Sequence, residues 1–346
     1  MNRTDPKSNA PIMMLSAGNG FIMQSEKYSR DNAGQSLKKY ILLKQGELAY
    51  NHGASKAKQF GCCYELTEPE ARIPYVYHCF KINEDEYTPY VAMALNNAKM
   101  DQQLKRLVSS SVRMDGLLNI SFEDYMSVTL HLPLFIEQKH IADFLKKLDE
   151  RIAYQERLIT SLKKYKRGLV KLVFEQTTME AQQQLPLSEM CISISSGRTT
   201  VSDTNGSFPL FGSTGVVGKT NTVEFDGDIV LVARVGANAG RVNYYSGQCA
   251  VTDNTLVIRV KDNIIQAKFL AYFLEYFDLH RLIFGSGQPL VTGGQLKKIE
   301  MPLVSYTAQD RITKRFEALD KIIDAQETYA LNLSRLKSGL MQQLFI

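Results

Sequence analysis

Residues 138–174 (QKHIADFLKKLDERIAYQERLITSLKKYKRGLVKLVF) and residues 309–345 (QDRITKRFEALDKIIDAQETYALNLSRLKSGLMQQLF) are two copies of one pattern. They align without a gap at twelve identical positions and lie 171 residues apart. Internal repeats indicate the architecture of a chain before any local pattern does. Because each copy follows a segment of nearly equal length, the repeat predicts two half-molecules in tandem.

Both copies have the hydrophobic spacing of a coiled coil. Apolar residues recur at alternating steps of four and three, which is typical of a coiled-coil seam rather than of the wider stripe of a globular helix. Polar residues interrupt this seam at Gln155 and Lys166, and again at the matching positions of the second copy. Polar groups in a seam cost stability but restrict register and partner choice. The predicted seam residues are Ile141, Leu148, Ile152, Gln155, Leu162, Leu169, Ile312, Leu319, Ile323, Gln326, Leu333 and Leu340.

We expect the two helices to pair antiparallel within one chain, related by a pseudo-twofold axis. A centred axis places Gln155 near Ala330 and Gln326 near Ile159, within one heptad. The remaining segments then become two globular domains separated by the helices. The predicted organisation is a first domain at 1–137, a spacer helix at 138–174, a second domain at 175–308 and a second spacer helix at 309–346.

Composition limits the class of protein. A chain of 346 residues predicts two or three domains. It has no run of about 18 apolar residues and its polar start lacks the core of a signal peptide, so no membrane association is expected. The five cysteines are odd in number and have no C-x-x-C spacing. They predict reduced thiols in a cytoplasmic protein rather than a disulfide framework or a zinc site.

Charge by itself does not predict DNA binding. The formal net charge is +5, and the segment 138–174 holds ten basic and four acidic residues. This is not the broad basic surface of a protein that binds nucleic acid by charge alone. The basic face of that helix is a solvated face by default, with a phosphate-facing or partner-facing role as the alternative.

Both predicted domains are β-rich with short helices, which gives an α+β fold. In the second domain, strands are expected at 227–234 and 255–260 and a buried helix at 269–277. The first domain repeats this order, with strands at 46–50 and 75–82 and a helix near 87–107. Two domains that bind different targets are expected to share the order of their strands and helices and to differ in their loops.

In this duplicated order the chain resembles the DNA specificity subunit of type I restriction-modification systems. The similarity covers nearly the whole chain. It includes Leu-Pro-Leu before Glu137-Gln138 at the first helix and Met301-Pro-Leu before Gln309 at the second. The segments 209–218 and 228–240 resemble the family's second target recognition domain.

The resemblance implies a non-catalytic subunit with two tandem target recognition domains. Each domain would read one half of a split site in double-stranded DNA, with the helices setting the gap between the halves. The implied partners are two modification (methyltransferase) subunits and restriction (translocase/endonuclease) subunits. S-adenosylmethionine, ATP and Mg²⁺ are expected only on those partners, and this chain is expected to hold no cofactor and no metal.

The start of the chain departs from the family pattern. Forty residues separate Phe174 from Gly215, but only 19 precede the apparent counterpart Gly20. About twenty residues that should open the first domain therefore lack a counterpart, which suggests an upstream start or a rearranged, inactive gene copy.

The motifs of alternative functions can be compared directly with the sequence. The segment 212–220 resembles a phosphate-binding loop, but its outer glycines are six residues apart instead of five and no helix is predicted after it. The methyl-donor loop and the Asn-Pro-Pro-aromatic motif of an adenine methyltransferase are absent. Two alternatives remain, a coiled-coil adaptor with two protein-binding heads and an enzyme with an unrecognised site.

Candidate DNA-binding residues are polar and basic side chains in predicted loops, since such side chains read base edges and phosphates. Arg234, beside a Gly-rich turn, and Lys219 are the leading candidates. The full set is Asn51, Ser55, Lys56, Lys58, Arg113, Arg198, Thr214, Lys219, Arg234, Asn238, Arg241 and Gln288.

Overall fold

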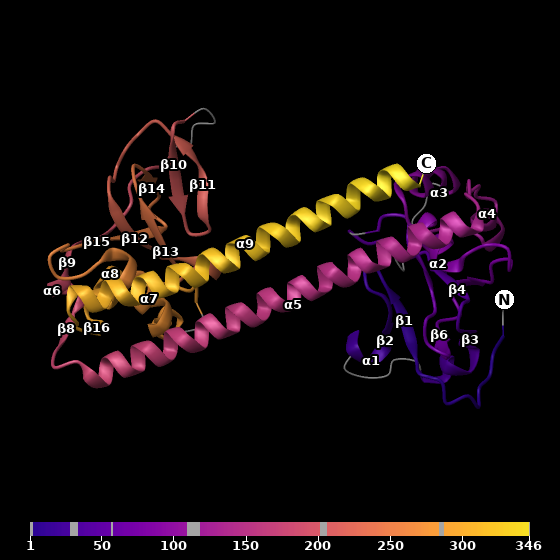
Figure 1. Ribbon diagram of the computed structural model, residues 1–346, viewed down its shortest axis with the longest axis horizontal. Coiled ribbons are helices and arrows are strands. Elements are labelled where there is room, and N and C mark those ends of the chain that lie inside the picture. The colour runs from indigo at the N-terminus through magenta and orange to yellow at the C-terminus, as the bar shows by residue number, and fades with distance from the viewer. Residues whose placement is uncertain are drawn as a thin grey trace. The chain divides into compact units, whose positions relative to one another are not determined.

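The computed structural model describes residues 3–27, 34–56, 58–108, 118–200, 206–283 and 287–345 (Figure 1). The chain divides into two compact units. The first unit consists of Met1–Tyr154 and Tyr329–Ile346, and the second of Gln155–Thr328. Two long helices, α5 (Phe135–Glu180) and α9 (Tyr306–Leu344), contribute residues to both units.

In the second unit the described strands form three sheets. Its further elements are β8 (Gln184–Pro186), α6 (Leu187–Met190), β9 (Cys191–Ser196), β10 (Phe208–Gly212), β11 (Gly215–Thr220), β12 (Asp228–Ala233), η2 (Gly236–Asn238), β13 (Val242–Ser246), β14 (Ala250–Val251), β15 (Thr255–Val260), α7 (Ala267–Phe277), η3 (Leu279–Leu282), α8 (Gly293–Lys297) and β16 (Glu300–Pro302). The sheets have the orders β13-β12-β15-β9, β11-β10-β14 and β16-β8. Strand β12 is apolar along almost its whole length, and the core formed with α7 keeps Val230 and Val232 fully buried.

The first unit has a smaller sheet of related order. Its elements are β1 (Met13–Ser16), β2 (Gly20–Met23), α1 (Gln24–Lys27), η1 (Gly34–Lys39), β3 (Ile41–Lys44), β4 (Leu48–Asn51), β5 (Cys62–Glu65), β6 (Glu70–Ile73), β7 (His78–Phe80), α2 (Thr88–Ala94), α3 (Ala98–Leu107) and α4 (Phe122–Met126). The sheet order β5-β4-β7 corresponds to β13-β12-β15. The single helix expected near 87–107 is wrong, because two helices occupy this segment. The second starts where the Asn97 side chain accepts a hydrogen bond from the Met100 N–H at 2.8 Å.

Both long helices begin three residues earlier than the repeat indicated, at Phe135 and Tyr306. At each start the backbone N–H of the repeat's first glutamine bonds a carbonyl four residues back, Leu134 for Gln138 and Ser305 for Gln309. The two starts are thus equivalent positions of the repeat. At the other end, α5 continues to Glu180, beyond the predicted residue 174.

The helices are antiparallel in the second unit. The Gln155 side chain, 1% exposed, donates a hydrogen bond to the Gln326 side chain inside the seam. Further along α5, Lys166 forms an ion pair with Asp320 at 2.5 Å. Residue numbers therefore rise along α5 while they fall along α9.

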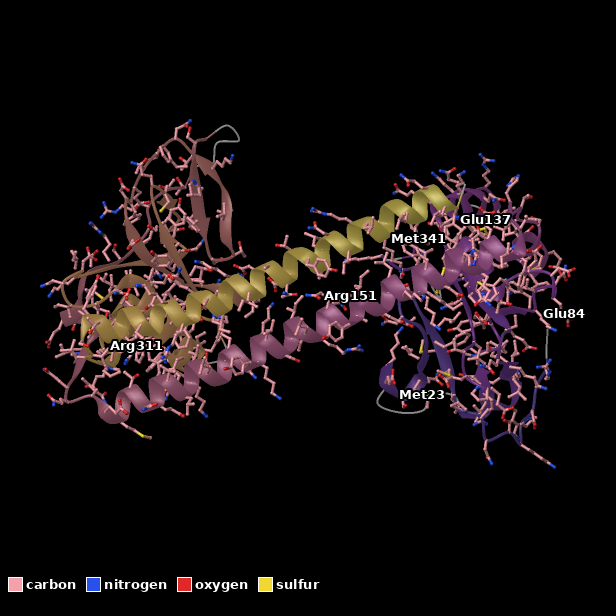
Figure 2. All side chains as sticks on the ribbon, in the orientation of Figure 1. Met23, Glu84, Glu137, Arg151, Arg311 and Met341 are labelled. Atoms are coloured by element: carbon pink, nitrogen blue, oxygen red, sulfur yellow. The ribbon has the colours of Figure 1, made fainter. Side chains whose placement is uncertain are left out.

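The same direction holds in the first unit. Lys337 forms an ion pair with Asp149, and the Arg151 guanidinium lies 5.7 Å from the ring centre of Tyr329 (Figure 2). Exchanging the two repeats converts the pair Lys166–Asp320 into the pair Lys337–Asp149. The predicted antiparallel pairing is confirmed within each unit, and the matched polar residues of the repeat bind one another.

The register differs slightly from the centred one. Gln155 was expected opposite Ala330 and instead bonds Gln326, four residues away and within the allowed heptad. A buried amide without a partner costs about 1–3 kcal/mol, so the two seam amides favour the register in which they meet. The twelve predicted seam residues are all buried or half-buried.

A buried glutamine joins each long helix to its own globular domain. Gln309 and Gln138 are both 1% exposed. The Gln309 side chain accepts from the N–H of Gln266, the N-cap of α7, at 2.9 Å. The Gln138 side chain accepts at 2.9 Å from the N–H of Tyr87, the N-cap of α2. One matched position of the repeat therefore satisfies a helix N-terminus in both units.

The five cysteines lie in the described part of the chain, are buried and form no disulfide. Burial raises the pKa of the Cys191 thiol to about 11 and that of Cys79 to about 12. These thiols are therefore protonated at neutral pH and serve as small core residues. Among the described helices, none is long and apolar enough to cross a membrane.

Replacing Gln309 with leucine should destabilise the second unit. The change removes the acceptor of the Gln266 N–H and the donor to the carbonyls of Ile264 and Val304, which lie 2.9 and 3.1 Å away. We expect the free energy of unfolding to fall by about 1–3 kcal/mol, the usual cost of unsatisfied buried polar groups. Urea unfolding followed by circular dichroism measures this, with the exposed Gln182→Leu as control. Equal effects of the two substitutions would contradict the role given to Gln309.

Candidate nucleic-acid interface

The candidate site lies at one edge of the second unit, where β12 ends. Arg234 follows the last residue of β12, and Asn238 and Arg241 lie in and after η2. The Ala233 N–H donates to the Arg241 carbonyl at 2.9 Å, and the Gly240 N–H donates to the Ala233 carbonyl at 2.8 Å. These bonds fold residues 234–241 into a compact loop that carries two arginines and one asparagine.

The segment containing Gln288 packs against this loop. The Val291 N–H donates to the Arg234 carbonyl at 2.8 Å, and the Gly236 N–H donates to the Pro289 carbonyl at 3.0 Å. Gln288 itself is exposed. Its amide is therefore held next to the Arg234 loop although the two are more than fifty residues apart in sequence.

The β10–β11 hairpin adds Thr214. A guanidinium nitrogen of Arg241, Nη1, donates to the Thr214 carbonyl at 3.4 Å, across the hairpin turn between Gly212 and Gly215. Lys219 lies on β11 opposite Pro209, away from this turn. The structure thus brings Thr214 to the edge but not Lys219. The segment 212–220 forms the turn and the second strand of this hairpin, and among the described residues no helix directly follows it, as the sequence indicated in arguing against a phosphate-binding loop.

Arg198 joins the same edge through Glu224. The Glu224 carboxylate accepts from the Arg198 N–H and from the Thr199 hydroxyl, both at 3.0 Å. The preceding Gly197 is required, because a Cβ there would lie 2.2 Å from the Val251 carbonyl oxygen. Arg198 is left exposed while its backbone is fixed against β14.

Six of the predicted residues therefore converge on one edge of the second unit, from four segments of the chain. The edge carries three guanidinium groups, which remain charged at any physiological pH, and the Glu224 carboxylate behind it already accepts from backbone and hydroxyl donors. We call this set the recognition edge: Arg198, Thr214, Arg234, Asn238, Arg241 and Gln288.

The predicted residues of the first unit are used differently. The Asn51 side chain accepts from the Gly53 N–H at 2.9 Å, and the Ser55 hydroxyl accepts from the Lys58 N–H at 3.0 Å. The Lys58 ammonium donates to the Asn96 carbonyl at 2.6 Å. These three side chains hold their own loop together, and Lys56 is exposed. Arg113 lies outside the described residues.

Sequence reasoning missed the turn at the centre of the recognition edge, Thr252–Asn254. Its Asp-Asn dipeptide between two strands is a common turn signal and could have identified it. Within the described residues, no group of three or more His, Cys, Asp or Glu side chains is placed to hold a metal ion.

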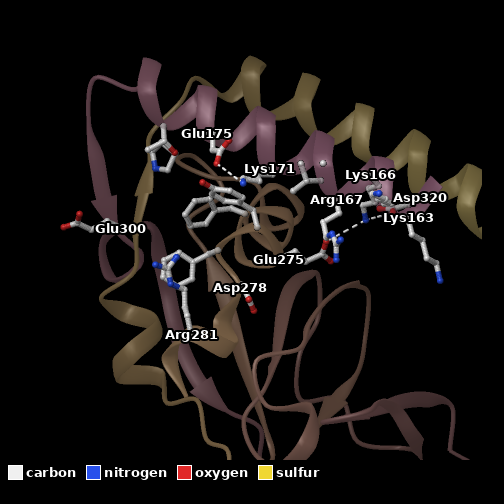
Figure 3. A pocket seen from close by; sticks show the side chains of 18 of the residues that line it. Lys163, Lys166, Arg167, Lys171, Glu175, Glu275, Asp278, Arg281, Glu300 and Asp320 are labelled. Atoms are coloured by element: carbon white, nitrogen blue, oxygen red, sulfur yellow. Dashed lines mark ion pairs between the residues drawn. The ribbon is translucent and has the colours of Figure 1, made fainter. Parts of the chain in front are cut away.

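A separate groove of about 1030 Å³ lies in the second unit between α5, α7 and β16 (Figure 3). Phe273 and Ile323 are buried residues in its lining, and Arg167 and Arg281 add charge to it. Lys166 binds both Asp320 and, at 3.8 Å, Glu275. Burial raises the pKa of Glu275 and Lys166 opposes this rise. Aromatic and arginine side chains together are typical of protein interfaces.

Comparison with known proteins defines the class. Residues 186–333, which contain the recognition edge, match the family model of the type I restriction modification DNA specificity domain. A Mycoplasma pneumoniae protein named as a type I specificity subunit is 28% identical over 122 residues, covering 34% of this chain and 40% of that relative. The matched part is thus less than half of that relative's length.

Solved structures show the same fold over nearly the whole chain. The type I restriction-modification S subunit from M. genitalium has a TM-score of 0.63 at 15% identity, covering 99% of this chain and 90% of the other. A chain from a structure of complex assembly and conformational transition of the type I system has a TM-score of 0.58 at 17% identity, with 99% and 94% covered.

The fold and the matched domain are those of a DNA specificity protein of type I restriction-modification systems. Residues 186–333 carry the DNA specificity domain of that class, and over nearly the whole chain the fold is that of the solved S subunits.

Arg241 should contribute a phosphate contact to DNA binding. Each neutralised phosphate adds about 0.9 to the slope of log K against log salt. We therefore expect Arg241→Ala to weaken binding to random duplex DNA and to reduce this slope by about 0.9. Arg259→Ala is the control, since Arg259 is exposed on β15 away from the edge. A fluorescence anisotropy titration at several salt concentrations measures both, and equal slopes for the two variants would count against the assigned edge.

Proposed function

We propose that this chain is the sequence-specific DNA-binding subunit of a type I restriction-modification complex. The observation that carries the proposal is the convergence of three arginines, two amide side chains and one threonine from four segments on the recognition edge. Arginine pairs with the major-groove edge of guanine, and asparagine or glutamine with that of adenine. Side chains of these types, exposed or half-buried on a backbone that hydrogen bonds hold in place, are suited to reading a short stretch of base pairs.

In this proposal the target is bipartite. The second unit reads one half-site, the first unit reads the other, and the paired helices set the gap between them. The chain itself is not a catalyst. Modification subunits bind S-adenosylmethionine and methylate adenine, and restriction subunits use ATP and Mg²⁺ for translocation and cleavage.

The partners of this chain are two modification subunits in addition to the restriction subunits and DNA. Support for docking on the helices comes from their exposed apolar side chains, which include Tyr165 at 60% and Ile322 at 46% exposure in the second unit. Exposed apolar patches rimmed by polar groups mark interaction sites. The groove beside α5 provides a second surface of interface-like composition.

The decisive experiment maps methylated adenine across the genome of cells that contain the modification subunits, with and without this chain. A single bipartite motif that is methylated only when the chain is present supports the proposal. Methylation of the same motif without the chain contradicts it. Methylation or cleavage by the purified chain alone would favour an enzyme instead. Assembly of unrelated proteins on the two heads without site-specific DNA protection would favour an adaptor.

Lengthening the helices should lengthen the unread gap in the DNA. One heptad inserted after Thr160 and another after Ile323 lie between the facing pairs Gln155–Gln326 and Lys166–Asp320, so both pairs are kept. Each helix gains about 10 Å at about 1.5 Å per residue. At about 3.4 Å per base pair, the preferred gap should grow by up to about three base pairs.

Sequencing of methylated sites reads out the gap and both half-sites, which should stay unchanged. The complementary control replaces residues 185–300 with another recognition domain, which should change one half-site and keep the gap. If the insertion altered base preference but not the gap, the helices would not set the spacing.

A further inference from the structure

The turn Thr252–Asn254 between β14 and β15 lies at the centre of the recognition edge. The Thr252 N–H donates to the Phe211 carbonyl at 2.9 Å, which ties the turn to the β10 hairpin. The Arg234 N–H donates to the Asn254 carbonyl at 2.9 Å, which ties it to the loop after β12. The Thr255 N–H closes the turn on the Thr252 carbonyl at 3.2 Å.

The segment after β9 holds the turn from a third side. The Gly197 N–H donates to the Thr255 carbonyl at 3.1 Å, and the Thr199 N–H donates to the Val251 carbonyl at 3.0 Å. Thr255 and Val251 are buried, at 1% and 0% exposure. Every one of these bonds joins backbone to backbone, so the turn is positioned without the use of its side chains.

The side chains of Asp253 and Asn254 are exposed. Within the described residues, neither makes an intramolecular hydrogen bond or ion pair. Other Asp and Asn residues of this chain brace their own turns. For example, Asp278 accepts from the His280 N–H at 3.3 Å, and Asn51 accepts from the Gly53 N–H. Asp253 and Asn254 therefore have hydrogen-bonding capacity that the fold does not use.

The chemistry of these two groups is that of base readers. A carboxylate at a DNA surface is repelled by phosphates, and its favourable partner there is the amino group of cytosine or adenine. An asparagine amide forms two hydrogen bonds with adenine N6 and N7. Flanking arginines supply contacts to guanine and to phosphate, so the edge as a whole can distinguish bases while it binds the backbone.

We infer that Asp253 and Asn254 are specificity-determining residues of the second unit, Asp253 for a base that presents an amino group and Asn254 for adenine. This inference rests on the proposed function of the chain. It adds residues at the centre of the edge that make the contact with bases, whereas the arginines around them also bind phosphate.

The chain contains a matched control for the test. The same dipeptide occurs as Asp262-Asn263 at the other end of β15, again in an exposed turn. The variants are Asp253→Asn and Asn254→Asp, and the controls are Asp262→Asn and Asn263→Asp. Each is assembled with the modification subunits, and methylated adenines are mapped in cells that otherwise lack the system. Thermal unfolding and co-purification check that each complex is intact.

We expect each edge variant to change or relax one position of one half-site. The preference at that position should fall by about tenfold, or about 1.4 kcal/mol, which lies within the discrimination that one good base contact supplies. The other half-site, the gap and both controls should keep the wild-type motif.

Three results would overturn the inference. They are an unchanged motif in both edge variants, a change of the same size in the controls, and loss of methylation at every site by an intact complex. The proposed function fails separately, if the wild-type chain supports no chain-dependent methylation.

Discussion

The buried amide at the start of each long helix is the constraint on which the rest of the structure depends. Gln138 and Gln309 are 1% exposed and each satisfies the first N–H of a helix in the adjacent globular domain. Burying an amide costs free energy, because the amide loses its hydrogen bonds to water. Here that cost is offset only in the geometry in which the amide bonds its partners in the protein. In each unit the long helix is therefore fixed against its globular domain, and the repeat places the same hydrogen bond in both units.

The seam between the helices uses the same principle for register. An all-apolar seam would tolerate sliding by a heptad, because leucine and isoleucine pack equally well after such a shift. The Gln155–Gln326 hydrogen bond and the pairs Lys166–Asp320 and Lys337–Asp149 remove that freedom. If the helices set the gap between half-sites, a fixed register is required, since a slip of one heptad would change the gap by about three base pairs.

The two units use their polar side chains differently. In the second unit mainly backbone bonds, such as Val291 N–H to the Arg234 carbonyl, hold the recognition edge, and Arg198, Arg241 and Gln288 are left exposed. In the first unit the side chains of Asn51, Ser55 and Lys58 hold the corresponding loop. The two units have a corresponding order of strands, but the loops present different side chains at their surfaces. One order of strands therefore carries two different surfaces.

The sequence by itself determined the architecture, because the repeat, its heptad spacing and its matched polar residues are periodic signals that local chemistry dictates. It also indicated Arg198, Thr214, Arg234, Asn238, Arg241 and Gln288 as polar loop residues. Only the tertiary structure decided that these six share one edge while Lys219 does not, and that Asp253 and Asn254 lie among them. It likewise decided that Gln155 faces Gln326 rather than Ala330, and that 87–107 forms two helices. The register depends on a side-chain bond between two helices and the break at Asn97 on a side-chain cap. The edge depends on backbone hydrogen bonds between segments far apart in the chain, and such bonds leave no periodic trace in the sequence because any residue except proline can donate them.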